Sequence, residues 1–369
     1  MKILIDGRLY GLENAGLGRY LINLVDQLSK LDNKNEYVLF LRKKYFDGLN
    51  LPENWKKVLV DIRHYSLAEQ IKIPGLIKKE NPDIVHFPHF NVPFFYRGKY
   101  IVTIHDMLMH KSVGLAATTL PAPLYLFKRL GYRLVFDNAI KRSAKIIVPS
   151  YSVKKELIKT YGISENKIEV TYEGVNANIN YSKGNPIDKP YFVYAGNAYP
   201  HKNLKRLIEA VVSLNTNCNQ SVNLVIASSR GIFTQRLEKI IRDQKAGEYV
   251  KLLGFVPDEK LFSLYKNSIG FVFPSLSEGF GLPGLEAMAA GTLVLAAETP
   301  VFKEIYQENA IYFNPLDFTS IEKAMQSVME MNPDLRKEKI EKAKDFAKRY
   351  SWAKMAKETL KVYTDYRNL

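Results

Sequence analysis

The chain has 369 residues, of which 46% are hydrophobic and 25% are charged, as is typical of a soluble globular protein with two or three domains. Its single cysteine, Cys218, excludes an internal disulfide framework and a cysteine-rich zinc site. The N-terminal apolar stretch is broken at Asp6, and no run of about 18 apolar residues occurs. The sequence therefore predicts neither a secretory signal nor a membrane-spanning helix.

The net charge of +15 is unevenly distributed along the chain. Residues 1–185 carry +11 and residues 186–369 carry +4, and the segment 99–159 alone carries +8. This asymmetry favours an anionic partner for the first half, such as a lipid surface, a lipid phosphate or a nucleic acid. The alternative is a generally basic protein that its charge keeps in solution.

Short β-branched runs alternate with amphipathic stretches along the first half, which predicts a parallel sheet covered by helices on both faces. The expected strands are 2–6, 37–41, 57–60, 83–87, 100–104, 145–148 and 168–172, and the expected helices lie near 17–30, 66–80, 121–142 and 151–161. A stretch rich in Asn, Gly and Pro, 176–190, is predicted to be an interdomain linker.

A second α/β series follows this linker and ends in an amphipathic helix that Ser351 opens. Its expected strands are 191–195, 222–227, 250–253, 269–273 and 293–296, and its helices lie near 202–214, 233–246, 258–266, 283–290 and 317–350. The expected fold class is therefore α/β, with two doubly wound Rossmann-like domains. Ligands should bind in the cleft at the carboxyl ends of the strands.

The most informative motif runs from Pro274 to Gly291 and directly follows the apolar strand 269–273. Gly279 and Gly281 favour turns that other residues resist, and a proline at 283 suits the first turn of a helix. The backbone N–H groups of such a loop bind anions, while Glu278 and Glu286 can accept hydrogen bonds from pairs of sugar hydroxyls. The combination suits a nucleotide diphosphate sugar; a plain strand–turn–helix connection, with Glu286 in the first helical turn, is the alternative.

This motif resembles the signature of glycosyltransferase family 4, retaining enzymes of the GT-B fold with two facing Rossmann-like domains. The segment Tyr199–Leu204 resembles the branch that includes the O-antigen mannosyltransferase B-like enzymes. The resemblance implies an acceptor-binding domain of residues 1–180 plus the terminal helix 352–369, and a nucleotide-sugar-binding domain of residues 181–351. It further implies that Glu286 holds the ribose and that Glu278 lies near hydroxyls of the donor sugar.

A second motif, Gly196–Asn203, follows the first strand of the second half and opens a helix. Lys202 at this helix start would neutralise a diphosphate and the charge that develops as it departs, whereas an exposed lysine is the alternative. Many members of the family carry an arginine just after the glycine, where this chain has Asn197. Arg230 is the candidate for the missing second cation.

A third motif, Thr103–Asp106, ends an apolar strand. The resemblance implies that His105 reaches toward the donor sugar, while Asp106 could orient the imidazole or cap the next segment; a pair that stabilises its own loop is the alternative. It also implies that the Gly16–Gly18 loop faces the diphosphate. We predict His105, Asp106, Lys202 and Glu278 as catalytic residues. The predicted donor site comprises Gly16, Gly18, Gly196, Asn197, Lys202, Arg230, Val256, Glu278, Gly279, Phe280, Gly281, Leu282 and Glu286.

The sequence offers little for a metal ion. No Asp-x-Asp pair occurs, so we expect no metal and no cofactor, with Lys202 and backbone dipoles acting in the metal's place. His86 and His89 could ligate a metal, but a structural role is favoured because a third ligand is missing.

The segment 120–136 mixes leucines and aromatic residues with three cations, Lys128, Arg129 and Arg133. This composition suits a helix on an anionic membrane surface, and equally a core helix with a basic solvent face. An acceptor on a lipid diphosphate would explain both this segment and the local charge. We therefore expect a cytoplasmic protein that is peripheral at the inner face of the cell membrane.

The sequence thus predicts a metal-independent retaining glycosyltransferase of cell-surface polysaccharide synthesis. The hexose is expected to be mannose from GDP-mannose, and the acceptor a glycan or a lipid-linked glycan. Among enzymes, a nucleotide-sugar epimerase or a phosphorylase of similar fold remains an alternative. Outside enzymes, a basic module that binds membranes or nucleic acid without turnover remains open, although the absence of a recognised motif disfavours nucleic acid.

Overall fold

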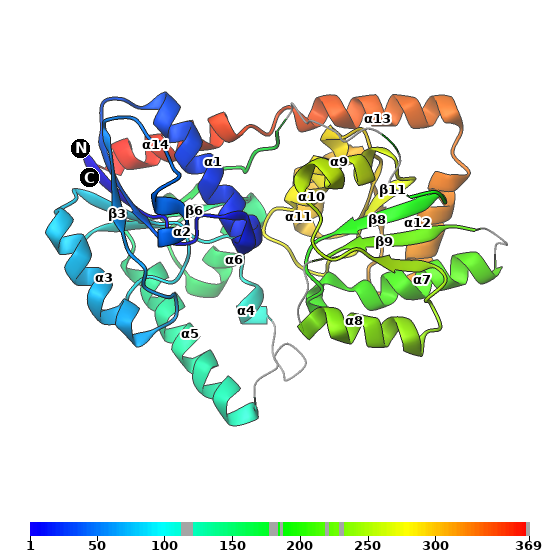
Figure 1. The fold of residues 1–369 in the computed structure, drawn as a ribbon, viewed down its shortest axis with the longest axis horizontal. Coiled ribbons are helices and arrows are strands. Elements are labelled where there is room, and N and C mark those ends of the chain that lie inside the picture. The colour runs from blue at the N-terminus through cyan, green and yellow to red at the C-terminus, as the bar shows by residue number, and fades with distance from the viewer. Residues whose placement is uncertain (112–120, 177–183, 185–186, 218–220, 229–231, 367–369) are drawn as a thin grey trace. The chain divides into compact units, whose positions relative to one another are not determined.

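The structure is a computed structural model that describes residues 1–111, 121–176, 184, 187–217, 221–228 and 232–366 (Figure 1). The described residues form two compact units. The first unit takes its residues from 1–107, 120–174 and 351–369, and the second from 108–119 and 175–350. The chain therefore enters the second unit and returns to the first for its last helix.

The first unit is built on a parallel sheet with the strand order β3-β2-β1-β4-β5-β6-β7. The order runs outward from β1 in one direction and then reverses to its other side, as in doubly wound folds. The apolar residues of the strands are largely buried because helices cover the sheet. The strands are β1 (Lys2–Asp6), β2 (Glu36–Leu41), β3 (Trp55–Leu59), β4 (Ile84–Phe87), β5 (Tyr100–Thr103), β6 (Lys145–Val148) and β7 (Ile168–Val170).

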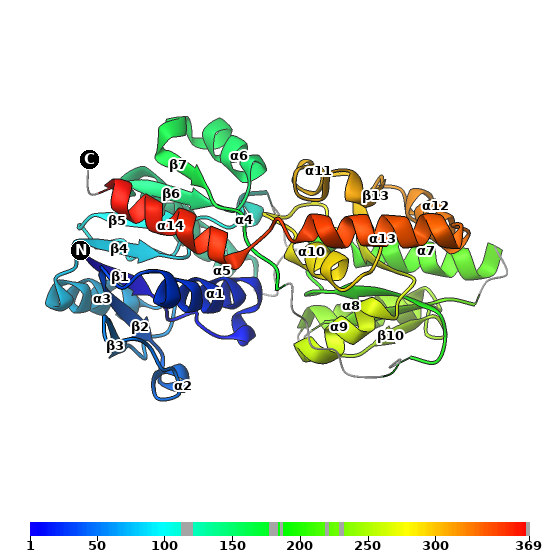
Figure 2. The ribbon, with the colours of Figure 1, turned by 90° about the horizontal axis from the view of Figure 1, so that it is seen from above.

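The helices of the first unit are α1 (Ala15–Leu31), α2 (Lys43–Phe46), α3 (Leu67–Glu80), α5 (Ala122–Arg142), α6 (Tyr151–Tyr161) and the terminal α14 (Trp352–Tyr366), with 3-10 turns η1 (Leu12–Asn14) and η3 (Glu165–Lys167). Side-chain oxygens cap α3 and α6, because Ser66 accepts from the N–H of Glu69 and Ser150 from that of Val153. Helix α14 lies beside α1, as Figure 2 shows. The terminal segment thus completes the hydrophobic core of the first unit.

The second unit repeats the pattern with a parallel sheet of order β10-β9-β8-β11-β12-β13. Its strands are β8 (Tyr191–Ala195), β9 (Asn223–Ala227), β10 (Val250–Leu252), β11 (Gly270–Phe273), β12 (Val294–Ala297) and β13 (Ala310–Phe313). Its helices are α4 (Leu108–Lys111), α7 (Leu204–Asn217), α8 (Ile232–Asp243), α9 (Asp258–Lys266), α10 (Leu282–Ala289), α11 (Pro300–Tyr306), α12 (Phe318–Met329) and α13 (Pro333–Ala347), with 3-10 turns η4 (Pro200–Lys202) and η5 (Gln307–Asn309).

The expected α/β fold class is confirmed in both units, and one predicted helix is corrected. The long helix expected over 317–350 is two helices, because Asn332 caps a new start at Pro333, which cannot continue the preceding helix. Strand β13 and helix α11 were not predicted. Strand β13 is a four-residue, half-buried strand at the sheet edge and therefore carries a weak hydrophobic signal.

Across the described part of the chain, no helix is both long and apolar enough to cross a bilayer.

Candidate active site

The strand order of the second unit reverses between β8 and β11, which lie side by side in the sheet. Ligands of doubly wound sheets bind at such a reversal, beyond the carboxyl ends of the strands. The loop after β8 holds residues 196–203, and the loop after β11 holds residues 274–281. Both sequence motifs of the second half therefore lie at the one position where the fold favours a ligand.

The two loops are tied together by charge and by backbone groups. The ammonium of Lys202 forms an ion pair with the carboxylate of Glu278, and both side chains are almost buried. The backbone N–H of Leu276 donates to the carbonyl of His201 at 2.8 Å. The amide of Asn203, a residue in the left-handed region at φ 59°, donates to the carbonyl of Pro274 at 3.2 Å. The site is thus preorganised before any ligand binds.

The start of α10 is shaped by Gly281, which adopts φ 100° as the residue before the helix. The hydroxyl of Tyr306 donates to the Gly281 carbonyl, and a side chain at 281 would collide with that hydroxyl and with the Phe302 ring. Gly279 lies in a bend of the loop, but without the positive φ that would require a glycine. Glu286 is the fifth residue of α10 rather than part of its first turn, and it is only 6% exposed.

The other predicted donor residues lie around the same strand ends. Gly196 directly follows β8 at φ 148°, and its N–H donates to the carbonyl of Ala227. The carbonyl of Asn197 accepts from the Tyr194 hydroxyl at 2.8 Å. Val256 lies in the loop between β10 and α9, while Phe280 and Leu282 are buried beside Gly281. Arg230 lies outside the described residues.

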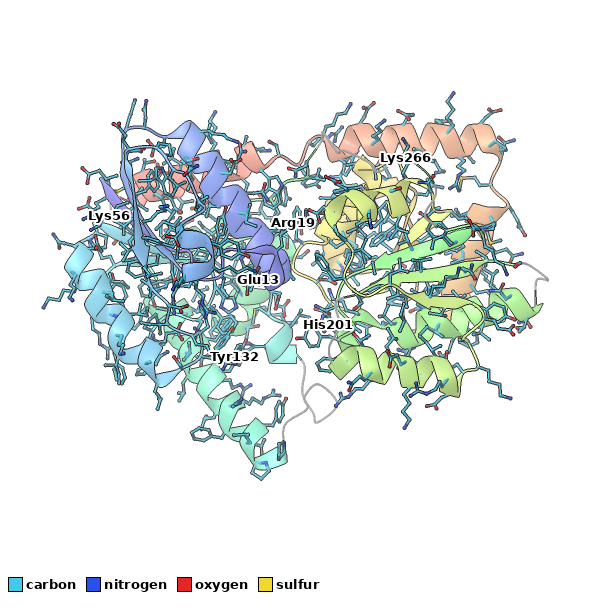
Figure 3. The ribbon with its side chains drawn as sticks, viewed as in Figure 1. Glu13, Arg19, Lys56, Tyr132, His201 and Lys266 are labelled. Carbon is cyan, nitrogen blue, oxygen red and sulfur yellow. The ribbon has the colours of Figure 1, made fainter. Side chains whose placement is uncertain are left out.

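Three buried polar atoms near these strand ends have no hydrogen-bond partner among the described residues. They are Nε2 of His201, Oγ of Ser228 and Oγ of Ser275. His201, labelled in Figure 3, lies in the turn after β8, while Ser228 follows β9 and Ser275 follows β11. Burial lowers the pKa of His201 to about 4, so this imidazole is neutral at physiological pH. Unsatisfied groups of this kind are uncommon in folded proteins and favour a ligand or ordered water here.

His105 belongs to the first unit and lies just beyond the end of β5, with Ile104 between the strand and the histidine. Its Nδ1 lies 3.3 Å from the carboxylate of Glu173 and its Nε2 lies 3.1 Å from the carbonyl of Pro88. The ring of Tyr20 packs edge-on against the imidazole, with the centroids 4.7 Å apart. Glu173 is the residue that sequence reasoning missed. Its position directly after a predicted strand, like that of His105, was the available signal.

Gly16 and Gly18 do not form a loop before a helix, as the sequence interpretation had it, because both lie within the first turns of α1. A side chain on Gly18 would overlap the carbonyl of Gly11, whereas Gly16 faces open space. Gly18 is therefore required for close packing of α1 against the preceding loop.

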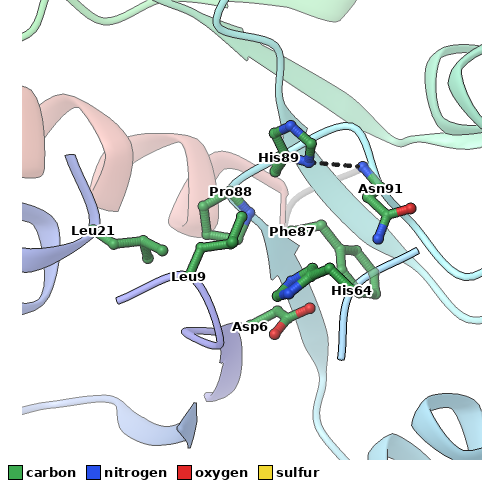
Figure 4. Close-up of a pocket in the computed structure, with 8 residues that line it drawn as sticks. All are labelled: Asp6, Leu9, Leu21, His64, Phe87, Pro88, His89 and Asn91. Atoms are coloured by element: carbon green, nitrogen blue, oxygen red, sulfur yellow. Dashed lines mark hydrogen bonds between the residues drawn. The ribbon is translucent and has the colours of Figure 1, made fainter. Parts of the chain in front are cut away.

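His86 has a structural role. Its Nδ1 lies 2.6 Å from the Tyr363 hydroxyl and its Nε2 lies 2.8 Å from the Thr103 hydroxyl. Both nitrogens are thereby occupied in a fully buried position. His89 lies in the loop after β4 and lines a small pocket of the first unit (Figure 4).

The predicted basic segment forms α5, and its two faces differ. Phe136, Ala139 and Ile140 are buried in the core, and the Tyr132 ring packs edge-on against Phe90 at 5.0 Å. The outward residues are mainly apolar: Leu124, Leu126, Phe127, Leu130 and Leu134 are all exposed, Phe127 by 75%. Lys128 and Arg133 are exposed among them, and Arg129 is half-buried beside the Tyr125 hydroxyl. The solvent face is therefore amphipathic rather than simply basic.

Known proteins resemble the chain over both halves. Residues 15–179 match the family "Glycosyltransferase Family 4", and residues 177–346 match "Glycosyl transferases group 1". The chain is 26% identical to the O-antigen chain mannosyltransferase RfbU of Salmonella typhimurium, with 94% of each chain covered. It is 25% identical to the O-antigen chain mannosyltransferase B of Escherichia coli, over 98% of this chain and 99% of that protein.

A solved structure agrees with the fold. The Anabaena protein Alr3699/HepE, in complex with UDP and glucose, superposes with a TM-score of 0.75 at 16% identity, covering 99% of this chain and 100% of that one. Together these findings show a GT-B fold built from two parallel-sheet α/β domains. The chain belongs to the glycosyltransferases of the family 4 and group 1 type, which confirms the expected family.

Proposed function

We propose that this glycosyltransferase transfers a hexose from a nucleotide diphosphate sugar, with retention at the anomeric carbon, to a glycan of a cell-surface polysaccharide. The observation that carries the donor assignment is the Lys202–Glu278 pair at the strand reversal of the second unit. The similarity to two O-antigen mannosyltransferases supports mannose as the sugar and GDP-mannose as the donor.

The ion pair suggests how one site handles both a diphosphate and a sugar. An incoming diphosphate would attract the Lys202 ammonium and release Glu278 to accept hydrogen bonds from the sugar hydroxyls. The buried Glu286 is proposed to hold the ribose, and the N–H groups at the start of α10 the diphosphate. Asn197 stands where the family often has an arginine, so Lys202 is the main cation proposed from the described residues.

In the proposed reaction, the acceptor oxygen bonds to the anomeric carbon while the bond from that carbon to the diphosphate oxygen breaks. The acceptor attacks on the face from which the diphosphate leaves, and its proton passes to the departing diphosphate oxygen. The protein contributes positioning and charge stabilisation rather than a nucleophile. His105, oriented by Glu173, and Asp106 are proposed to act near the transferred sugar.

The acceptor is proposed to be lipid-linked, with the enzyme peripheral at the cytoplasmic face of the membrane. The support is the exposed apolar face of α5 together with the charge of +8 over residues 99–159. An amphipathic helix of this kind lies in the interface of an anionic leaflet.

A panel of nucleotide sugars tests this function directly. GDP-mannose, UDP-glucose and UDP-galactose are incubated with the protein and a synthetic lipid-diphosphate-linked monosaccharide. Release of nucleoside diphosphate with elongation of the lipid supports the proposal, most directly with GDP-mannose. An interconverted donor would indicate an epimerase, phosphate-dependent turnover would indicate a phosphorylase, and no change would indicate a binding module.

Metal dependence is tested by repeating the panel in excess EDTA, where we expect undiminished activity. A loss of activity that magnesium or manganese restores would contradict metal independence.

A further inference from the structure

The imidazole of His105 is held on three sides by groups of the first unit. Its Nδ1 faces the Glu173 carboxylate and its Nε2 faces the Pro88 carbonyl, at 3.3 Å and 3.1 Å. The ring of Tyr20, from α1, packs against it with the two ring planes at 82°. Only 13% of the His105 side chain is exposed, so the ring has little room to turn. The orientation of this imidazole therefore depends on where Glu173 and Tyr20 are placed.

Tyr20 is placed by a chain of hydrogen bonds that begins in the terminal helix α14. The Tyr363 hydroxyl lies 2.6 Å from Nδ1 of His86, and Nε2 of His86 lies 2.8 Å from the Thr103 hydroxyl. The Thr103 hydroxyl in turn lies 3.4 Å from the Tyr20 hydroxyl, which is the longest link of the chain. All four side chains are buried, so water does not compete for these bonds. The Thr359 hydroxyl, one turn before Tyr363 on α14, also contacts the Tyr20 hydroxyl.

The chain of hydrogen bonds carries no charge. Burial lowers the pKa of His86 to about 3 and raises the pKa of Tyr20, so both groups are neutral at physiological pH. A neutral imidazole donates from one ring nitrogen and accepts at the other. Removing the hydroxyl of either Tyr363 or Thr103 therefore leaves one nitrogen of His86 unpaired in the core. An unpaired buried nitrogen favours a shift of the ring toward a new partner, and the rest of the chain shifts with it.

The second partner of His105 also lies against α14. Gly174 follows Glu173, and a side chain at Gly174 would overlap the backbone nitrogen of Trp352, the first residue of α14. Helix α14 further lies beside α1, which carries Tyr20 (Figure 2). The start of α14 therefore adjoins the segment that presents Glu173, and its later turns adjoin the helix that presents Tyr20.

We propose that α14 positions the His105 imidazole for sugar transfer, chiefly through the Tyr363–His86–Thr103 chain to Tyr20. Tyr20 and Tyr363 are then positioning residues, because they act on the reaction only through His105. This inference rests on the proposed function, since it takes His105 to act near the transferred sugar. It gives the terminal helix a part in turnover as well as a place in the core.

The orientation of His105 is measured by NMR on the full-length protein with 13C-labelled histidine, and its signals are assigned by their loss in His105→Gln. We expect Tyr363→Phe and Thr103→Val to shift or broaden the His105 ring signals. Thr103→Ser, which keeps the hydroxyl, and Tyr366→Phe, at the half-buried last residue of α14, should leave them in place. Unmoved His105 signals in Tyr363→Phe and Thr103→Val overturn the inference, whatever the activity of the protein.

Turnover separates positioning from a purely structural role. With GDP-mannose and the lipid-diphosphate-linked monosaccharide, we expect kcat to fall about tenfold in Tyr363→Phe and Thr103→Val, and KM for the donor to stay within about twofold. A displaced catalytic group slows the chemical step more than it weakens binding. Thr103→Ser should restore wild-type turnover. A kcat equal to that of the wild type in both Tyr363→Phe and Thr103→Val overturns the inference.

Variants of Tyr20 test the same chain from its other end. Tyr20→Phe keeps the ring on His105 and should lower kcat about tenfold, whereas Tyr20→Leu also removes the ring and should lower it about 100-fold. Because Tyr20→Phe and Tyr363→Phe cut one chain, the double variant should be no slower than the slower single variant. Losses that multiply in the double variant overturn the chain as the route to His105.

The two readouts separate this inference from the function on which it rests. Sugar transfer that is unaffected by Tyr363→Phe, Thr103→Val and Tyr20→Phe overturns the inference alone. A wild-type protein that transfers no sugar with any donor of the panel overturns the proposed function, and the NMR comparison still decides whether α14 holds His105 in place.

Discussion

Tyr363 in the terminal helix places its hydroxyl 2.6 Å from Nδ1 of His86, which is 277 residues earlier in the chain. The other ring nitrogen of His86 contacts the Thr103 hydroxyl of β5. One imidazole therefore connects β4, β5 and α14 inside the core of the first unit. The bond explains how the returning helix, which begins at Trp352, is held to a sheet whose last strand ends at Val170.

We expect Tyr363→Phe to lower the free energy of unfolding of the first unit by about 1–3 kcal/mol, because it leaves a buried imidazole nitrogen without a partner. Both tryptophans, Trp55 and Trp352, belong to this unit, so their fluorescence in urea follows its unfolding selectively. Tyr366→Phe, at the half-buried last residue of α14, serves as the matched control. Equal urea midpoints for the two variants would contradict a stabilising role for the bond.

Acidification should destabilise the same unit. Burial lowers the folded-state pKa of His86 to about 3, below its ordinary value of 6.5, and His64 and His89 are shifted in the same direction. Between pH 6.5 and 3 the unfolded chain binds more protons, so stability is full above pH 6.5 and falls as the pH drops. His86 alone should cost roughly 2 kcal/mol between pH 6.5 and 5.

The measurement is the urea midpoint by tryptophan fluorescence at pH 7.5, 6.5 and 5.5. We expect the midpoint to fall on each step, and the fall to be smaller in His86→Gln, which cannot take up the proton. A wild-type midpoint that stays constant over this range would show that these histidines are not held neutral by the fold.

Lys202→Ala should lower turnover more than donor affinity, because negative charge on the leaving diphosphate grows in the transition state. We expect kcat to fall about 100-fold, the usual effect of losing one preorganised electrostatic contact. Lys205→Ala, which replaces an exposed lysine at the start of α7, is the control with the same change of charge. If saturating donor restores full turnover in Lys202→Ala, the lysine is a simple anion-binding group.

Glu286→Ala should weaken nucleotide binding by about 1.5–3 kcal/mol, the value of a hydrogen bond to a charged group. Calorimetry with GDP, UDP and the matching 2′-deoxy nucleotides measures this effect. The affinity for the deoxy nucleotides should differ little between the wild type and Glu286→Ala, because they lack the hydroxyl that the carboxylate is proposed to bind. Glu298→Ala, at an exposed glutamate paired with Lys303 at 3.0 Å, is the matched control. Unchanged affinity in a folded Glu286→Ala protein would refute the ribose assignment.

The positions of Lys202 and Glu278 could be predicted because each follows an apolar strand, and parallel strands bring their carboxyl ends to one edge. The contacts that complete the candidate site could not be predicted from the sequence. Glu173 meets His105 from 68 residues away, and the Tyr20 ring reaches the same imidazole from α1. Such long-range contacts leave no local pattern in the sequence. The start of α1 at Ala15 was missed for a different reason, since its two glycines read as a loop.

The last prediction concerns α5 and the membrane. Each basic residue close to an anionic leaflet contributes about 1 kcal/mol, and exposed apolar side chains add an attraction that salt does not screen. Sedimentation with vesicles should therefore rise with anionic lipid and fall in part with salt. Replacing Lys128, Arg129 and Arg133 with Ser should remove the salt-sensitive part, and replacing Phe127 and Leu130 with Ser the salt-resistant part. A triple Ser variant at Lys337, Lys339 and Lys342 of α13 loses the same charge and should sediment like the wild type. If the wild-type protein ignores anionic vesicles at low salt, the apolar face of α5 has another partner and a soluble acceptor becomes the better proposal.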